Sequence, residues 1–219
     1  MRVSRGFMSS MLGLSSNKSS TRRSRMMDRY NNTNTANRFL NAQSANKTNS
    51  TQSNYLSMKE NAGEVQSIAS KLTDTGEDSL FAKAEESGDT TAVTKQIKDF
   101  VNKYNGMVRN LKTSGGRVDN SYLNQLNANA KMYRSALQAT GVTQNADGTL
   151  SVNDKTLAGA SAEQLKKAWG PGSFTTKTIS AAKNVQSNAV NGINNLIANS
   201  YSNLLRGYGS KGNYFNFWS

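Results

Sequence analysis

Cysteine and histidine are absent from this chain of 219 residues, and proline occurs once. Without these two side chains, thiol and imidazole nucleophiles are excluded, and so are zinc or iron sites built from cysteine and histidine. The near absence of proline leaves long stretches in which a helix can run without interruption. No stretch approaches the roughly 20 consecutive apolar residues that a membrane-spanning helix needs. We therefore expect no cofactor and no membrane span.

Catalysis by other side chains has little support in the sequence. Carboxylates are scarce, with 14 acidic residues in the whole chain. The remaining pairings of a nucleophile with a base are Ser161 with Lys166 or Lys167, and Tyr104 beside Lys103. Chance occurrence in a chain rich in serine and lysine explains both pairings. The sequence therefore predicts that the protein is not an enzyme.

The scarce acidic residues are also unevenly placed. The first 58 residues contain nine lysines and arginines against the single acid Asp28, whereas nine of the 14 acids lie between Glu60 and Asp99. No acid follows Glu163. The formal net charge of +13 therefore belongs mainly to a basic N-terminal segment.

Residues 1–52 are rich in serine, asparagine, threonine and arginine, and their hydrophobic residues are scattered singly. Burial of so few apolar side chains cannot offset the entropy lost on ordering, so we expect a flexible basic arm. Two interpretations stay open, a solvated linker and a segment that binds nucleic acid or another anionic polymer through counterion release. In the second case the contacts would come from Arg22, Arg23, Arg25 and Arg29.

Residues 53–169 carry apolar side chains at helical spacing, which predicts a mainly α core. A first helix is expected from Leu56 to Leu72. Two further helices carry heptad seams, from Val93 to Leu111 and from Leu123 to Thr140, joined by Gly115-Gly116. Matching seams and a short linker predict an antiparallel helical hairpin or coiled-coil bundle. The side chains expected to pack this hairpin are Phe100, Val101, Tyr104, Leu126, Tyr133 and Leu137.

A small β-ribbon is expected directly after this hairpin, within residues 142–152. Val142 and Thr143 would face Leu150 and Val152 across a turn that contains Asp147-Gly148. A two-stranded ribbon is marginally stable alone, so it must pack against the helices.

Residues 170–219 predict one long helix and an aromatic tail. The helix is expected from about Thr176 to Leu205, and no charged residue lies between Lys183 and Arg206. A solvated helix normally carries charged pairs, so this asparagine-rich surface favours packing on another subunit, although a low-charge helix inside a bundle gives the same pattern. The tail would either dock on a partner or cover the end of the bundle. The expected contact residues are Ile193, Leu196, Leu204, Phe215, Phe217 and Trp218.

The stretch from Lys98 to Leu157 carries a further pattern. A helix with F-V-x-x-Y-N precedes a helix that ends before G-V, and D-G-x-L then leads to an acidic residue and a leucine. The matching residues are Phe100, Val101, Tyr104, Asn105, Gly141, Val142, Asp147, Gly148, Leu150, Asp154 and Leu157. Their order and spacing resemble the C-terminal core of the bacterial flagellar filament-cap family, also called hook-associated protein 2. Family members are usually much longer, so the chain resembles a divergent, shorter relative.

This resemblance implies a secreted structural protein of the bacterial flagellum. In the cap family, terminal helices join the subunits, and the ring of subunits guides flagellin into the growing filament. The expected partners are further copies of the chain or other flagellar or surface subunits, and the expected location is the cell surface. The arm would then resemble the unfolded leaders by which flagellar subunits are exported. The alternative hypothesis is a cytoplasmic protein that binds nucleic acid or another anionic polymer through its arm.

Overall fold

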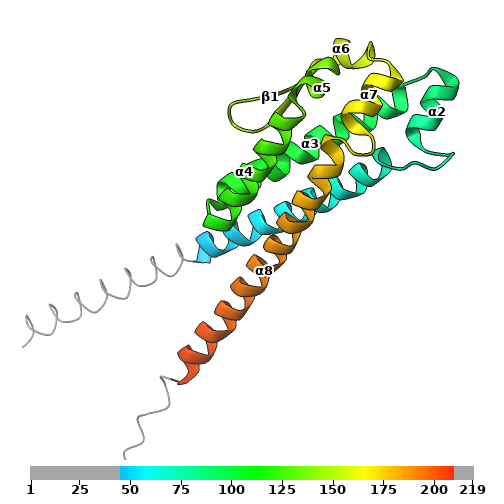
Figure 1. Cartoon of the computed structure of the whole chain (residues 1–219). Helices are drawn as coiled ribbons and strands as arrows, with labels where there is room; N and C mark the ends of the chain where they lie inside the picture. Colours follow the sequence, from blue (N-terminus) through cyan, green and yellow to red (C-terminus); the bar gives the residue numbers. More distant parts are fainter. Residues whose placement is uncertain (1–44, 210–219) are drawn as a thin grey trace, which may run out of the picture. The chain divides into compact units, whose positions relative to one another are not determined.

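The computed structural model describes residues 45–209, with side chains through residue 202. Helices dominate this part of the chain, together with one two-stranded antiparallel ribbon (Figure 1). The predicted fold class, mainly α with a small β-ribbon, is confirmed. After a helix at residues 45–72, the elements are α2 (Leu80–Ser87), α3 (Thr91–Ser114), α4 (Arg117–Met132), α5 (Arg134–Ala139), β1 (Val142–Gln144), β2 (Leu150–Val152), α6 (Asp154–Ala158), α7 (Ala162–Trp169) and α8 (Phe174–Gly209).

Residues 45–52, which the sequence analysis assigned to the arm, are helical. Contacts just beyond this segment hold the helix in place. The Asn54 Nδ2 donates to the Asn110 carbonyl at 3.1 Å and to Ser114 Oγ at 2.7 Å, and the Asn54 Oδ1 accepts from Asn110 Nδ2 at 2.9 Å. Amide side chains hold this helix to α3, and a hydrophobic pattern does not reveal them. Residues 1–44 lie outside the described part.

The core is built around α3. All of its predicted heptad positions are buried, and it ends at Gly115, whose φ of 62° suits glycine and whose N–H donates to the Leu111 carbonyl at 3.1 Å. The 45–72 helix supplies five fully buried side chains to this core: Met58, Ala62, Val65, Ala69 and Leu72. The predicted helix before the hairpin is therefore confirmed, and it is longer than the pattern indicated.

Four aromatic rings meet at the centre of the core. Trp169 and Phe174 each lie edge-on to Phe100, with ring centroids 5.7 Å and 6.0 Å away, and Phe174 also contacts Tyr104 at 5.8 Å. The indole Nε1 of Trp169 donates to Thr140 Oγ1 at 3.0 Å. The cluster thus joins α3 to two segments that are distant from it in sequence, α7 and the first turn of α8.

The second heptad helix is broken at Tyr133, which corrects the prediction of one continuous helix to Thr140. Tyr133 has φ −101° and ψ 16°, and its hydroxyl donates to the Gly172 carbonyl at 3.0 Å. The break lets α5 pack on β1 and α7, while α4 packs on α3 and α8. Neither glycine nor proline marks this position, so the uninterrupted apolar spacing concealed the change of direction.

The β-ribbon is confirmed at the predicted residues. Val142 pairs with Val152 and Gln144 with Leu150, across a turn in which Gly148 has φ 85°. Asn105 of α3 holds the ribbon through both backbone groups of Leu150. Its Nδ2 donates to the Leu150 carbonyl at 2.8 Å, and its Oδ1 accepts from the Leu150 N–H at 2.7 Å. The side chain therefore takes the place of a third strand at this residue.

Replacing Asn105 by alanine should destabilise the protein by about 2–3 kcal/mol, because both backbone groups of Leu150 lose their partner. The free energy of unfolding in urea measures this effect. Asn102→Ala is the matched control, since Asn102 is an exposed asparagine of the same helix. Equal losses in the two variants would contradict a specific role of Asn105 in holding the ribbon.

Tyr104→Phe should raise the free energy of unfolding by about 1 kcal/mol. The Tyr104 hydroxyl is buried without a hydrogen-bond partner among the described residues, and burial raises the pKa of this phenol. Tyr133→Phe is the control and should be slightly destabilising, since it removes the bond to Gly172. A clear loss of stability in Tyr104→Phe would reveal a partner for its hydroxyl.

Candidate assembly surface

The long helix α8 has two unlike parts. From its start to Ala189 it contributes to the core, with Ala181, Ala182, Val185 and Ala189 fully buried. From residue 191 to residue 202 the side chains are exposed or half-buried. Other elements therefore cover one side of this helix only in its first part, and the side chains of the second part are accessible to solvent.

Polar contacts fix the first part of α8 against two neighbours. The Asn188 Nδ2 donates to Asp119 Oδ1 on α4 at 2.6 Å. On the other side, the Gln66 Nε2 of the 45–72 helix donates to Gln186 Oε1 at 3.1 Å. Amide groups can donate and accept without carrying charge, so they join the helices at little electrostatic cost.

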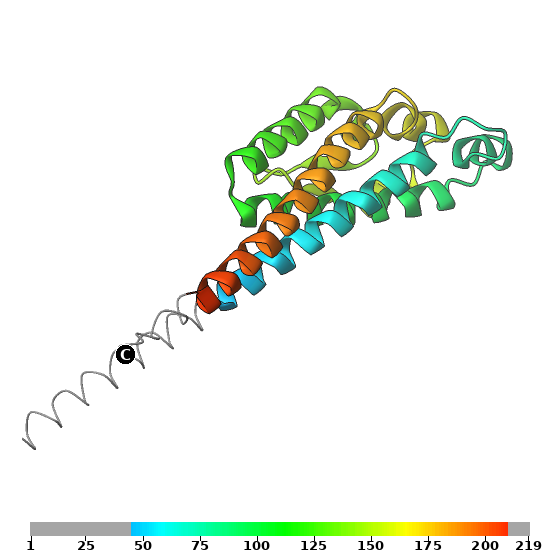
Figure 2. The same ribbon diagram turned by 90° about the horizontal axis from the view of Figure 1, so that it is seen from below.

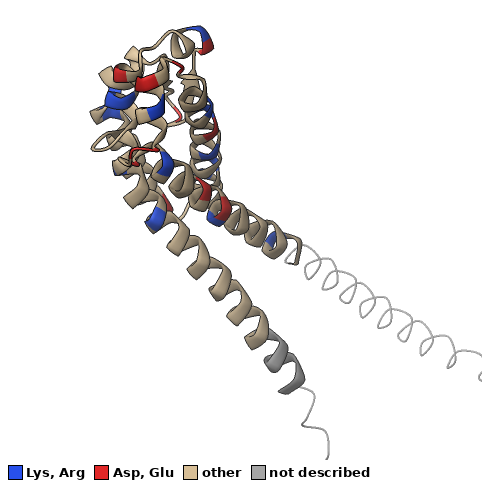
Figure 3. Ribbon diagram, turned by 90° about the vertical axis from the view of Figure 1, so that its right-hand side faces the viewer, with Lys and Arg blue, Asp and Glu red and all other residues tan. Residues whose placement is uncertain are grey.

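At Gly192, α8 approaches the 45–72 helix closely. A Cβ built on this glycine would lie 2.7 Å from the Tyr55 ring, so the absence of a side chain permits the contact. The two helices run beside each other in the contact region in Figure 2. In Figures 1 and 3, α8 extends beyond this contact clear of the other elements of residues 50–209. The second part of α8 thus leaves the core.

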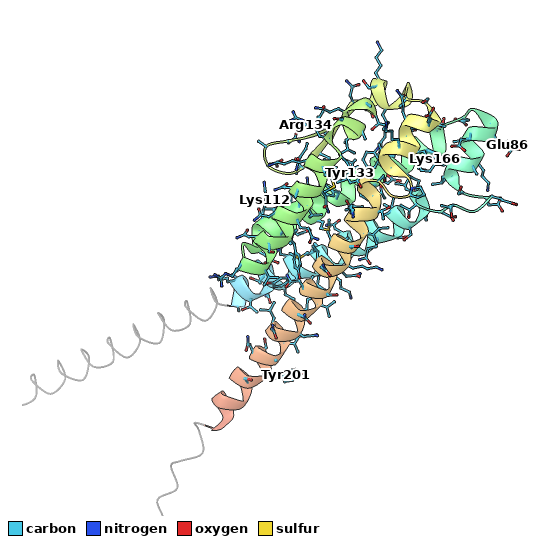
Figure 4. All side chains as sticks on the ribbon, in the orientation of Figure 1. Glu86, Lys112, Tyr133, Arg134, Lys166 and Tyr201 are labelled. Atoms are coloured by element: carbon cyan, nitrogen blue, oxygen red, sulfur yellow. The ribbon has the colours of Figure 1, made fainter. Side chains whose placement is uncertain are left out.

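Beyond this contact, apolar side chains are exposed. Tyr201 is 66% exposed and Ile197 44%, and on the neighbouring helix Leu56 is 49% exposed. Ile193 and Leu196 are half-buried. Figure 4 shows Tyr201 on the segment of α8 that extends from the core. We define residues 191–202 of α8 as the α8 surface.

The α8 surface carries no charge. Figure 3 draws this length of the helix without a lysine, arginine, aspartate or glutamate. Its polar residues are mostly asparagines, and Asn191, Asn194, Asn195 and Asn199 are exposed. An uncharged surface with interspersed apolar residues can be covered by another helix without burying an unpaired charge. This is the chemistry expected of a helix-packing interface.

The residues proposed from the sequence fall into three groups. Phe100, Val101, Tyr104, Leu126 and Leu137 are buried in the core, so they pack this chain and are inaccessible to a partner. Tyr133 is half-buried at the break between α4 and α5. Of the residues proposed for contacts with other subunits, Ile193 and Leu196 lie on the α8 surface, and Leu204 lies further along the same helix.

The remaining proposed residues lie outside the described part of the chain. They are Phe215, Phe217 and Trp218 of the aromatic tail and Arg22, Arg23, Arg25 and Arg29 of the arm.

The sequence did not predict several exposed side chains and hydrogen bonds of this region. Exposure of Leu56 and Tyr201 depends on where neighbouring helices separate, which no local pattern encodes. Asn105 stood within the F-V-x-x-Y-N pattern, and that pattern could have indicated a role for it. The pairing of Asp119 with Asn188 joins residues 69 positions apart, and no signal in the sequence links them.

The pairs first considered for catalysis have structural partners. Ser161 Oγ caps α7 by accepting from the Gln164 N–H at 3.2 Å. Lys166 forms an ion pair with Glu85 at 2.7 Å. Lys103 forms an ion pair with Glu64, and its neighbour Tyr104 is buried in the aromatic cluster. These contacts give Ser161, Lys166, Lys103 and Tyr104 places in the fold, and Lys167 is exposed.

Asp119 is the buried carboxylate of this region. Burial raises its pKa above the ordinary value of 3.8, while hydrogen bonds from the Gly116 N–H and from Asn188 act in the opposite direction. It lies in the first turn of α4, where the helix dipole favours a negative charge. The contact between α4 and α8 therefore includes a group whose charge depends on pH.

Residues 45–209 lack the features of two further kinds of site. None of the helices in this range combines the length and the hydropathy needed to cross a membrane. The same residues contain no group of three or more aspartates or glutamates placed to hold a metal ion.

Comparisons with known proteins give no relative for the chain. No protein-family model, no curated protein and no solved structure matches it significantly. The chemistry of the α8 surface is therefore the basis for a functional proposal.

The stability of Asp119→Asn relative to wild type should rise as the pH increases from about 3 to about 7. The folded pKa of Asp119 lies above its unfolded value, so the folded state binds this proton more tightly. The stability that wild-type Asp119 gains from this proton is present below the unfolded pKa and is lost as the pH rises through the folded pKa. Urea unfolding at several pH values measures the difference.

Asp89→Asn provides a control of opposite sign. A hydrogen bond to Thr91 lowers the pKa of Asp89, so the ionised carboxylate contributes stability that is lost as the pH falls through its folded pKa. The stability of this variant relative to wild type should decrease as the pH rises. If the free energies of unfolding of Asp119→Asn and wild type changed in parallel with pH, burial would not raise the pKa of Asp119.

Proposed function

We propose that the protein is a structural assembly subunit that associates with further copies of itself through the α8 surface. One observation carries this proposal: a helix anchored in the core up to Ala189 continues as an uncharged segment with exposed Ile197 and Tyr201. The first part fixes the direction of the helix, and the second part is available to a partner. No catalytic step is part of this proposed function.

Association would be driven by burial of apolar side chains. Full burial of an exposed isoleucine or a similarly large apolar side chain stabilises a complex by roughly 1.5–3 kcal/mol. Ile193, Leu196, Ile197 and Tyr201 together offer several such contributions, and Leu56 on the adjoining helix extends the apolar area. The asparagines between them can form hydrogen bonds across a helix pair. Since no ion pairs are required, association of this kind resists salt.

The sequence resemblance supplies the biological setting of the proposal. Resemblance to the flagellar filament-cap family favours a component of a flagellum or of another bacterial surface assembly, in which terminal helices join the subunits. The partners would be copies of this chain or other flagellar or surface subunits, outside the cell. The uncharged α8 surface supports this proposal because helix packing is the mechanism that the resemblance implies.

An alternative function follows from the charge of the N-terminal segment. Nine lysines and arginines in the first 58 residues could neutralise the phosphates of nucleic acid or another anionic polymer. In that case Arg22, Arg23, Arg25 and Arg29 would provide contacts without base specificity. Such binding would weaken steeply with salt, in contrast to association through the α8 surface.

Ile197→Asp should weaken self-association about tenfold or more, because it places a charge in the apolar contact. Light scattering and sedimentation of the full-length protein at low and high salt measure this change. Ala158→Asp is the control, since Ala158 is an exposed apolar residue of α6, outside the α8 surface. Circular dichroism should be the same for both variants and wild type.

The outcomes separate the two proposed functions. A salt-resistant oligomer that Ile197→Asp disrupts and Ala158→Asp preserves supports assembly through α8. A wild-type protein that is monomeric at both salt concentrations contradicts it. If that monomer binds duplex DNA at low salt, and deletion of residues 1–44 abolishes the binding, the basic arm carries the function.

A further inference from the structure

A pocket of about 320 Å³ lies between the end of α4, the start of α5 and the turn of the β-ribbon. Its lining includes two cations, Lys131 and Arg134, together with the amide side chains of Asn127, Gln144 and Asn145. The Gln144 Nε2 donates to Asn127 Oδ1 at 3.0 Å, which fixes part of the polar wall. All of these groups are suited to an anion with hydrogen-bond acceptors.

The two cations of this pocket have no counterion within the described residues. Neither the Lys131 nor the Arg134 side chain takes part in an ion pair or a hydrogen bond there. No acidic residue lies between Asp119 and Asp147 in the sequence. Asp119 is buried against α8, and Asp147 is bound to Thr149 and to Lys112 at 3.7 Å. The positive charge of the pocket is therefore uncompensated by its own surroundings.

An acidic segment provides the opposite charge on the same chain. Residues 74–89, which form a loop and α2, contain six carboxylates and one lysine in a chain whose net charge is +13. Two of these carboxylates, Glu77 and Glu86, are exposed and have neither an ion pair nor a hydrogen bond among the described residues. We name residues 74–89 the acidic edge.

The acidic edge and the pocket cannot meet within one molecule. In Figure 1, α2 lies on one side of the folded unit, and α4 with the turn of the ribbon lies on the other. Figure 4 places the labelled Glu86 and Arg134 on these two sides. The contacts agree, because α2 packs on α3 and α7, whereas α4 packs on α3 and α8. Complementary charges on opposite sides suit a contact between two molecules.

We propose that the pocket at Lys131 and Arg134 binds the acidic edge of a second copy of this chain, with Glu77 or Glu86 as the entering carboxylate. The two surfaces differ, so the contact is head-to-tail and repeats from copy to copy, which generates a ring if the rotation closes and a filament if it does not. Charge complementarity would set the register of neighbouring copies, while the apolar α8 surface contributes affinity. This inference rests on the proposed self-association and adds a second, separate contact to it.

A charge exchange on the full-length protein tests this contact. Arg134→Glu and Glu86→Lys should each weaken self-association roughly tenfold at low salt, because each places like charges opposite one another. Mixing the two variants in equal amounts should restore association between them, since each supplies the surface that the other needs. Sedimentation velocity of each variant and of the mixture measures these changes.

Matched controls change the net charge equally at other sites. Arg117→Glu alters an exposed residue at the start of α4, outside the pocket, and Glu60→Lys alters an exposed residue of the 45–72 helix. Both controls should associate as the wild type does. Circular dichroism of all four variants verifies that each retains the fold.

Each result supports or overturns the proposal. Association in the equal mixture of Arg134→Glu and Glu86→Lys, stronger than that of either variant alone, supports a head-to-tail contact. Unchanged association of Arg134→Glu and Glu86→Lys overturns it, even if Ile197→Asp shows that the α8 surface is used. Loss in Arg134→Glu alone, with inorganic phosphate binding to the wild type, also overturns it and assigns the pocket to a free anion. A wild type that is monomeric at every salt concentration contradicts both proposals together.

Discussion

Burial of one face of α3 is the constraint on which the other elements depend. Its apolar side chains meet the 45–72 helix, while the Phe100 and Tyr104 rings contact Phe174 at the start of α8. Asn105 on the same helix holds the β-ribbon through two hydrogen bonds. One helix thus positions a second helix, the ribbon and the beginning of the long C-terminal helix. Without the regular spacing of apolar side chains along α3, these segments would have no common partner in the core.

Amide side chains explain how a chain with 35% hydrophobic residues and a mean hydropathy of −0.68 forms this structure. The contact of Asn54 with Asn110, that of Gln66 with Gln186 and that of Asn188 with Asp119 each join two helices. Such bonds contribute little net stability individually, yet they leave few buried polar groups unpaired and fix how the helices are aligned. The low mean hydropathy of the chain is therefore compatible with its fold, because polar contacts between helices supplement the apolar core.

The two proposed contacts differ in their physical basis, which makes them complementary in an assembly. The α8 surface is uncharged and exposes apolar side chains among its asparagines, so it offers affinity that salt affects little. The pocket at Lys131 and Arg134 and the acidic edge depend on charge, so they offer orientation that salt weakens. An assembly that used both would associate through helix packing and would select its register through electrostatics. Neither contact requires the residues that build the core.

The sequence by itself determined the buried face of α3, the ends of that helix, the β-ribbon and its turn, and the uncharged length of α8, because each depends on residues close together in the chain. Only the tertiary structure decided the break at Tyr133, the helical state of residues 45–52 and the point near Gly192 where α8 leaves the core. These features arise from contacts between distant residues, such as Tyr133 with Gly172. Local spacing carries no information about such contacts, so the exposed surface could be located only after the helices were packed.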